Sequence, residues 1–80
     1  MSEGIHRIAI IGAGSWGTAL SVLAAKRGHV VTLWSHEPEV AEAIRKQREN
    51  SVYLPGVLLP SNVRATTSLE EALDGADVVI

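Results

Sequence analysis

Stretches of consecutive apolar residues alternate along the chain with stretches in which apolar residues recur every three or four positions. Two such stretches predict strands over residues 5–11 and 30–34, and the later half of the first is continuously apolar, which is typical of parallel strands that are covered on both faces. The pattern between them predicts a helix over residues 15–27. The apolar stripe that we expect to face the core consists of Trp16, Ala19, Leu20, Leu23 and Ala24, and the polar residues off this stripe are Thr18, Ser21 and Lys26.

A second helix follows the second predicted strand. Pro38 fits its first turn, and the helix extends to about Arg48. Acidic residues near its start and basic residues near its end suit the helix dipole. We expect Val40, Ala41 and Ile44 to form its buried side.

Residues 50–62 contain two prolines and a glycine but are also rich in Val, Leu and Tyr. We expect an ordered loop packed on the body of the domain or on a partner domain, because a solvated linker would be more polar. Residues 63–67 predict a short strand. The sequence Ser68-Leu69-Glu70-Glu71 predicts a capping box that opens a short helix, which ends at Gly75 before a final strand over residues 76–80.

These elements predict an α/β fold with a Rossmann-type parallel sheet, in the order β-α-β-α-loop-β-α-β and with right-handed crossovers. The chain of 80 residues has room for little more than one of the two mononucleotide-binding halves of such a domain. It also ends in an apolar run that resembles a strand cut in mid-course. We therefore expect residues 1–80 to be a partial N-terminal dinucleotide-binding domain of a longer enzyme.

The turn between the first strand and the first helix carries Gly12, Gly14 and Gly17 in a G-x-G-x-x-G pattern. In this position the pattern is typical of dinucleotide binding. The first glycine permits the tight turn, the second lets the backbone approach the pyrophosphate, and the third lets the helix lie close to the strand. The N–H groups at the helix start favour an anion. The alternative is an ordinary tight turn that packs the helix on the sheet.

Two residues inside this loop are further candidates for cofactor binding. Ser15 can donate its hydroxyl or its backbone N–H to a phosphate, or serve as the N-cap of the helix. Trp16 can cover the pyrophosphate at the mouth of the loop, or belong to the core through the apolar stripe. The sequence leaves both pairs of roles open.

The residues after the second strand bear on the choice between NAD and NADP. NAD-preferring sites usually place Asp or Glu at this strand end to bind the ribose 2′-OH, but Ser35 and His36 stand here. Glu37 has roughly the required spacing, yet it precedes Pro38, and we interpret it as the N-cap of the next helix. A hydroxyl and an imidazole that can carry charge suit a 2′-phosphate, so we expect NADP(H) as well as NAD(H) to bind. The alternative for His36 is a solvated loop residue.

Composition and charge narrow the partners. The net charge of −2 gives no electrostatic case for nucleic acid or an anionic membrane, and no apolar stretch approaches the roughly 18 residues of a membrane span. The lack of cysteine excludes thiolate catalysis and Cys-ligated zinc, and it suits the cytoplasm, where we expect the protein to be. His6 and His29 have no partner at metal or triad spacing, so we interpret both as structural and expect no metal.

A second segment makes a family resemblance specific. Residues 50–60 follow the pattern N-x-x-Y-L-P-G-x-x-L-P, which includes Tyr53. Together with the glycine loop of residues 12–20 and the sequence Leu33-Trp34-Ser35-His36, this segment resembles the bacterial-type NAD(P)-dependent glycerol-3-phosphate dehydrogenases. These segments span most of the chain.

The resemblance implies reversible hydride transfer between NAD(P)H and dihydroxyacetone phosphate, which gives sn-glycerol 3-phosphate for phospholipid synthesis. It implies that Ser15, Trp16, His36 and Tyr53 line the cofactor site. The catalytic lysines and the helical substrate domain of this family lie after residue 80, so we expect no catalytic residue in this chain and no activity from it alone. A homodimer is a candidate assembly.

Two other functions remain as alternatives. One is another reductase of the same superfamily, of the 6-phosphogluconate, ketopantoate or hydroxyacid type, which would share the glycine loop but not the segment around Tyr53. The other is a noncatalytic domain that senses a dinucleotide and signals through a partner. The residues that follow Ile80 would distinguish an enzyme from a sensor.

Overall fold

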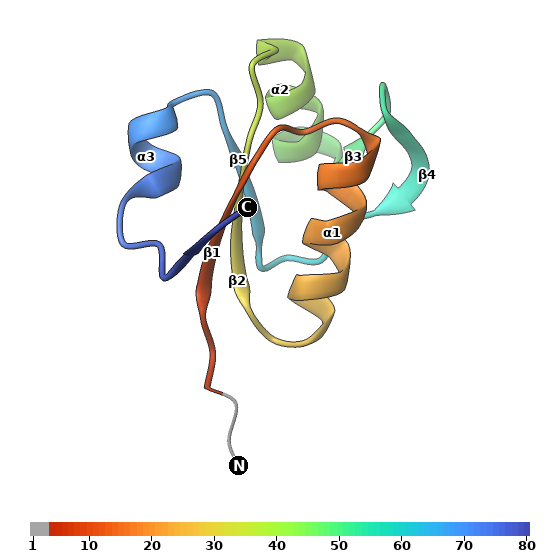
Figure 1. The fold of residues 1–80 in the computed structure, drawn as a ribbon. Coiled ribbons are helices and arrows are strands. Elements are labelled where there is room, and N and C mark those ends of the chain that lie inside the picture. The colour runs from red at the N-terminus through yellow and green to blue at the C-terminus, as the bar shows by residue number, and fades with distance from the viewer. Residues whose placement is uncertain (1–3) are drawn as a thin grey trace.

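A parallel sheet of four strands in the order β5-β2-β1-β6 forms the centre of the structure, a computed structural model that describes residues 4–80 (Figure 1). Helices α1 and α2 cover one face of this sheet and α3 covers the other, as Figure 1 shows. The strands are β1 (Arg7–Ile11), β2 (Val30–Trp34), β5 (Val63–Thr66) and β6 (Val78–Val79), and the helices are α1 (Ser15–Lys26), α2 (Pro38–Gln47) and α3 (Leu69–Leu73). The strand order is that of the first half of a Rossmann fold, which confirms the predicted α/β class.

The position of β1 and β2 inside the sheet explains why most of their residues are apolar. Arg7 lies opposite Val30, and the pairing continues without a bulge to Ile11 opposite Trp34. Helices cover both faces of these two strands, so residues on either side of the strand become buried. Leu33 is fully buried, and the predicted side of α2 packs against the same core.

The helix ends follow the predicted signals, with one difference. Pro38 occupies the first turn of α2, and α1 ends at Lys26, two residues before Gly28. The Ser68 hydroxyl caps α3 by accepting the Glu71 N–H at 3.1 Å. The reciprocal bond of a capping box is absent from the described residues, because Glu71 accepts the Thr66 hydroxyl instead.

The predicted buried face of α1 is wrong. The residues that α1 buries are Thr18, Ser21, Val22 and Ala25, whereas Trp16 is 77% exposed and Leu23 is 59% exposed. Of the expected stripe, Leu20 and Ala24 pack partly against the core. The helix lies close to the sheet, and small side chains such as those of Ser21 and Ala25 fit in the narrow space between them. The Ser21 hydroxyl donates to the Thr18 carbonyl at 2.7 Å, so its burial leaves no unpaired donor.

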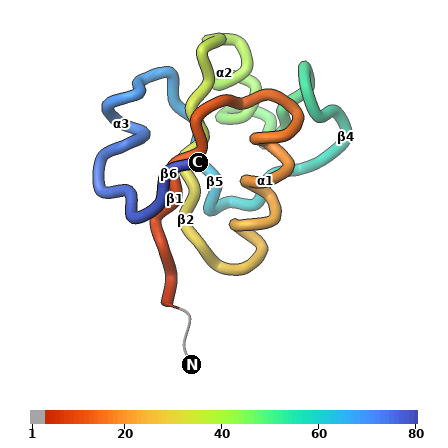
Figure 2. The backbone as a smooth tube through the Cα atoms, viewed as in Figure 1, coloured from red at the N-terminus to blue at the C-terminus, as the bar shows by residue number. Residues whose placement is uncertain are grey.

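The segment expected to be a loop is an antiparallel hairpin. Strands β3 (Glu49–Asn50) and β4 (Leu54–Leu58) pair with an irregular register, and the hairpin lies beside α1 (Figure 2). The expectation that it packs on the body of the domain is confirmed, since Leu59 is 4% exposed within the core. Its backbone N–H donates to the Arg48 carbonyl at 2.7 Å, which anchors the hairpin at the end of α2.

The two ends of the described chain meet at the start of β1. The Arg7 N–H donates to the Asp77 carboxylate at 2.8 Å, and the Asp77 N–H donates to the Arg7 carbonyl at 2.7 Å. This pair fixes β6 against β1. The first and last strands of the chain are both shorter than predicted: β1 begins at Arg7 rather than Ile5, and β6 covers Val78–Val79 only. Among residues 4–80, no helix has the length and apolar character needed to cross a membrane.

Candidate cofactor-binding site

The glycine loop leaves the carboxyl end of β1 and leads directly into α1. Gly12 has a φ of +123°, a conformation that residues with a Cβ rarely adopt, so the turn at the strand end requires glycine. Its N–H donates to the Trp34 carbonyl at 3.0 Å, which holds the loop at the end of β2. In Rossmann-type sheets ligands bind at the carboxyl ends of the strands, next to the point where the strand order reverses, and here the chain adds β2 and β5 on one side of β1 and β6 on the other.

Gly17 is required by the packing of α1 on β1. A Cβ placed on Gly17 would lie 2.0 Å from the Gly12 carbonyl oxygen and 3.3 Å from the Ile10 side chain. A backbone oxygen cannot move away cheaply, so any side chain here would push the helix off the strand. The predicted role of the third glycine in helix-strand packing is therefore confirmed.

Gly14 has a different reason to lack a side chain. Its φ of −73° suits any residue, and a Cβ built on it would meet no atom within 4 Å. The fold itself therefore does not demand glycine here, and the open space in front of Gly14 is free for a ligand. In glycine loops of this pattern the pyrophosphate takes the space that a Cβ at the second glycine would occupy, and this space is open at Gly14.

The start of α1 faces this open space with backbone donors. Gly14 is the N-cap, so the N–H groups of Ser15, Trp16 and Gly17 belong to the first turn and have no partner inside the helix. No side chain of the described residues caps them. These N–H groups and the positive end of the helix dipole attract an anion.

The structure excludes one of the two alternative roles of Ser15 and one of the two alternative roles of Trp16. Ser15 is the first residue of α1 rather than its N-cap, so the capping role is wrong. Trp16 is mostly exposed, so a place in the core of residues 4–80 is also wrong. Both side chains lie at the exposed helix start, where contact with a cofactor remains a prediction.

The end of β2 is shaped by Ser35. Its side chain is 2% exposed, and its hydroxyl accepts the Glu37 N–H at 3.0 Å and donates to the Glu37 carbonyl at 2.9 Å. This hydroxyl therefore builds the turn into α2. His36, in contrast, is exposed, and its ring centroid lies 6.2 Å from that of Trp34. Contact of either residue with a ribose or 2′-phosphate stays a prediction.

Glu37 occupies the N-cap position of α2, as predicted, but its side chain makes no capping bond. Its Oε1 instead accepts the Tyr53 hydroxyl at 2.6 Å. This hydrogen bond to Glu37, together with the negative charge of the carboxylate, raises the pKa of Tyr53. The structure thus brings together the N-cap residue of α2 and the aromatic residue of the hairpin.

Asn50 is a site residue that the sequence reasoning did not single out. It is fully buried, and its amide nitrogen donates to the Ala13 carbonyl and to the Thr18 hydroxyl, each at 2.8 Å. Its side-chain oxygen accepts the Tyr53 N–H at 3.1 Å. One side chain therefore connects the glycine loop, α1 and the turn that carries Tyr53. The available signal was a polar residue at the start of an apolar segment.

His6 and His29, which we interpret from the sequence as structural residues, lie at the opposite end of the sheet from the glycine loop. The His29 ring accepts the His6 N–H at 3.1 Å, and the two ring centroids are 5.4 Å apart. Within residues 4–80, no group of three or more His, Cys, Asp or Glu side chains is arranged to hold a metal ion. The interaction at His29 joins the residue before β1 to the residue before β2.

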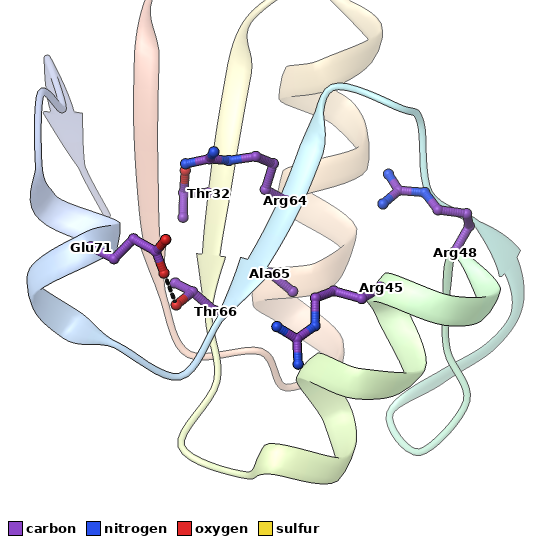
Figure 3. Close-up of a pocket in the computed structure, with 7 residues that line it drawn as sticks. All are labelled: Thr32, Arg45, Arg48, Arg64, Ala65, Thr66 and Glu71. Carbon is purple, nitrogen blue, oxygen red and sulfur yellow. Dashed lines mark hydrogen bonds between the residues drawn. The ribbon is translucent and has the colours of Figure 1, made fainter.

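A separate cavity of about 420 Å³ opens at edge strand β5. Figure 3 shows Arg64 beside Thr32 on one side of it and Arg45 and Arg48 reaching in from α2 on the other. The Arg48 guanidinium donates to the Val63 carbonyl at 2.8 Å and so holds the end of α2 against β5. The lining contains no glycine-loop residue, so this cavity is distinct from the space in front of Gly14.

Comparison with known proteins agrees with this geometry. Residues 7–80 match the family described as the N-terminus of NAD-dependent glycerol-3-phosphate dehydrogenase. The chain belongs to this family. Glycerol-3-phosphate dehydrogenase (NAD(P)+) of Alcanivorax borkumensis is 53% identical over 79 residues, which are 99% of this chain and 23% of the relative. The enzyme of the same name from Chlorobium limicola is 52% identical over 73 residues, 91% of this chain and 22% of the relative.

Solved structures of the family have the same fold. The glycerol-3-phosphate dehydrogenase of Coxiella burnetii superposes with a TM-score of 0.88 at 39% identity, over 94% of this chain and 23% of that one. The yeast enzyme superposes with a TM-score of 0.85 at 27% identity, over 95% and 25%. The chain thus spans about a quarter of the length of its relatives. The predicted family resemblance is confirmed, and the glycine loop is that of a glycerol-3-phosphate dehydrogenase N-terminus.

Proposed function

We propose that this chain is the dinucleotide-binding part of an NAD(P)-dependent glycerol-3-phosphate dehydrogenase. The protein would interconvert sn-glycerol 3-phosphate and dihydroxyacetone phosphate by hydride transfer, in glycerophospholipid synthesis. The observation that carries the proposal is the open space in front of Gly14 at the start of α1, which a Cβ would fill although the fold does not require glycine there. Family membership and the position of this loop at the end of β1 support it.

The residues of this chain bind and orient the cofactor. In the proposal, Gly12 sets the turn, Gly17 holds α1 close to β1, and the N–H groups at the helix start bind the pyrophosphate. In the proposal, Trp16 and Tyr53, which both expose aromatic surface, contact the bound cofactor. When bound, the nicotinamide supplies the hydride acceptor or donor. No residue of this chain is assigned to catalysis, because the resemblance places the catalytic lysines after residue 80.

Binding of NADP(H) is part of the proposal. His36 stands exposed where NAD-preferring enzymes usually have a carboxylate, and its imidazole suits the ribose 2′-phosphate. Ser35 contributes the turn that presents His36 through its two bonds to the Glu37 backbone. We further propose a cytoplasmic location, which the lack of cysteine supports.

The test is an assay of the purified full-length protein for NADPH oxidation on addition of dihydroxyacetone phosphate. We expect turnover, and we expect the Gly14→Val variant to lose at least about tenfold in NADPH affinity because its side chain fills the phosphate space. Gly4→Val is the matched control, since Gly4 lies outside the loop and also has nothing within 4 Å. Turnover with 6-phosphogluconate or ketopantoate instead would favour another reductase, and NADPH binding without turnover on any of these would favour a sensor.

A further inference from the structure

Asn50 is fully buried, and both hydrogens of its side-chain amide are donated in hydrogen bonds. Its two N–H bonds go to the Ala13 carbonyl and the Thr18 hydroxyl, and the oxygen accepts the Tyr53 N–H. Burying a polar side chain is unfavourable unless its bonds are satisfied. This satisfied set fixes three segments that lie up to 37 residues apart in the sequence.

The bond to Ala13 has a consequence for the next peptide group. The Ala13 carbonyl and the Gly14 N–H belong to one planar trans peptide unit, so they point in opposite directions. Asn50 and Thr18 hold the Ala13 carbonyl oxygen toward the interior, at 2.8 and 3.4 Å. The Gly14 N–H therefore points away from the Asn50 amide and the Thr18 hydroxyl. No backbone carbonyl among residues 4–80 accepts it.

We propose that Asn50 is a positioning residue that turns the Gly14 N–H toward the phosphates of a bound dinucleotide and sets the Tyr53 turn beside them. This inference rests on the proposed function. Without Asn50 the Ala13-Gly14 peptide unit loses its inward partner and can rotate, because the glycine on one side of it tolerates many backbone angles. A donor that must first be reoriented binds an anion less well than one already aimed at it.

The sharpest variant is Asn50→Asp. The carboxylate keeps the shape of the side chain and the acceptor for the Tyr53 N–H, but it replaces the amide hydrogens with an oxygen that repels the Ala13 carbonyl. The matched control is Asn62→Asp, because the Asn62 amide likewise donates two bonds, to the Ala25 and His29 carbonyls at 2.9 and 2.8 Å, at the opposite end of the sheet. Both variants lose two amide donors.

We expect Asn50→Asp in the full-length protein to raise the Kd for NADPH and for ADP-ribose, and the KM for NADPH, about tenfold or more, with kcat within about twofold. Asn62→Asp should leave all of these unchanged at a comparable thermal unfolding midpoint. Equal Kd values for the two variants would overturn the inference but leave the proposed function standing. Failure of the wild-type protein to bind either ligand would overturn both.

A measurement on the wild-type protein keeps the inference testable if Asn50→Asp does not fold. In an NMR titration with ADP-ribose, the Gly14 amide proton should move downfield as it forms a bond to phosphate, and the Asn50 side-chain amide protons should exchange slowly with water before and after. An unshifted Gly14 amide at saturation, or rapidly exchanging Asn50 protons, would contradict the proposed orientation.

Discussion

The Tyr53 hydroxyl donates a 2.6 Å hydrogen bond to the Glu37 carboxylate and so joins the hairpin to the start of α2. Because the bond and the negative charge both favour the protonated phenol, the pKa of Tyr53 lies above its ordinary value of about 10. The stabilisation is therefore complete below pH 10 and is lost as the pH rises through the raised pKa of Tyr53 in the folded state. We expect Glu37→Gln to lower the pH at which Tyr53 ionises.

This shift is measured from the absorbance of the ionised phenol during an alkaline titration, as the difference between wild-type and Glu37→Gln protein. Glu39→Gln is the matched control, since the charge of Glu39 is the smallest of the causes that raise the pKa of Tyr53 and acts without a hydrogen bond. An unchanged titration of Tyr53 in Glu37→Gln would show that the two side chains are not bonded in solution.

Alanine substitutions at Gly17 and Gly14 should affect different properties, the first the stability of the fold and the second the binding of NADPH. Gly17→Ala should destabilise the fold by at least about 3 kcal/mol, because its Cβ would lie 2.0 Å from the Gly12 carbonyl oxygen. Gly14→Ala should change the free energy of unfolding by no more than about 0.5 kcal/mol, since its Cβ meets nothing. It should nevertheless weaken NADPH binding. Denaturant unfolding and NADPH titration of both variants check this, and the reverse assignment of effects would contradict the geometry.

Coenzyme preference should depend on His36. We expect wild-type protein to use NADPH at least as well as NADH, and His36→Glu to lower the ratio of the two kcat/KM values about tenfold by repelling the 2′-phosphate. His6→Glu introduces the same charge change at the opposite end of β1 and should leave the ratio unaltered. A wild-type preference for NADH of more than about tenfold would instead favour Glu37 as a ribose ligand.

Residues 1–80 alone should associate and should show no dehydrogenase activity. Val78, Val79 and Ile80 are 39, 54 and 56% exposed, and β6 is an edge strand with unpaired backbone groups. Val79→Lys should reduce this association, because a charged residue on an edge strand opposes pairing with another chain. Sedimentation at several concentrations measures the effect. A monomer at all concentrations would mean that the exposed edge is tolerated.

The elements that could be predicted from the sequence are those whose structure depends on residues adjacent in the sequence. The strand, glycine loop and helix around Gly12 and Gly17, and the Pro38 helix start, follow from local turn geometry and helix capping, and they were predicted closely. Local periodicity misled only in α1. There the most apolar stripe, with Leu23, faces outward, while the sheet accepts a face of small residues that includes Ser21.

The remaining features depend on contacts between distant segments. Asn50 meets Ala13 across 37 residues and Thr18 across 32, so no periodic pattern indicates these bonds. The bond between Tyr53 and Glu37 also joins segments that are distant in the sequence, so no local pattern indicates it. Ser35 was assigned to the ribose, and its burial against the Glu37 backbone depends on how the turn folds.

The pairing of Arg7 with Asp77 also constrains the order in which the sheet can form. β1 meets β2 after a separation of 23 residues, but it meets β6 only after 70. Loop closure becomes less favourable with length, and parallel pairing between distant segments is slow. At ribosomal speeds of about 5–20 residues per second, β6 is synthesised on the order of 3–14 s after β1, and until then one side of β1 lacks its partner strand. The strand that leads into the glycine loop is thus the first of the four to be made, and its second neighbour in the sheet is the last.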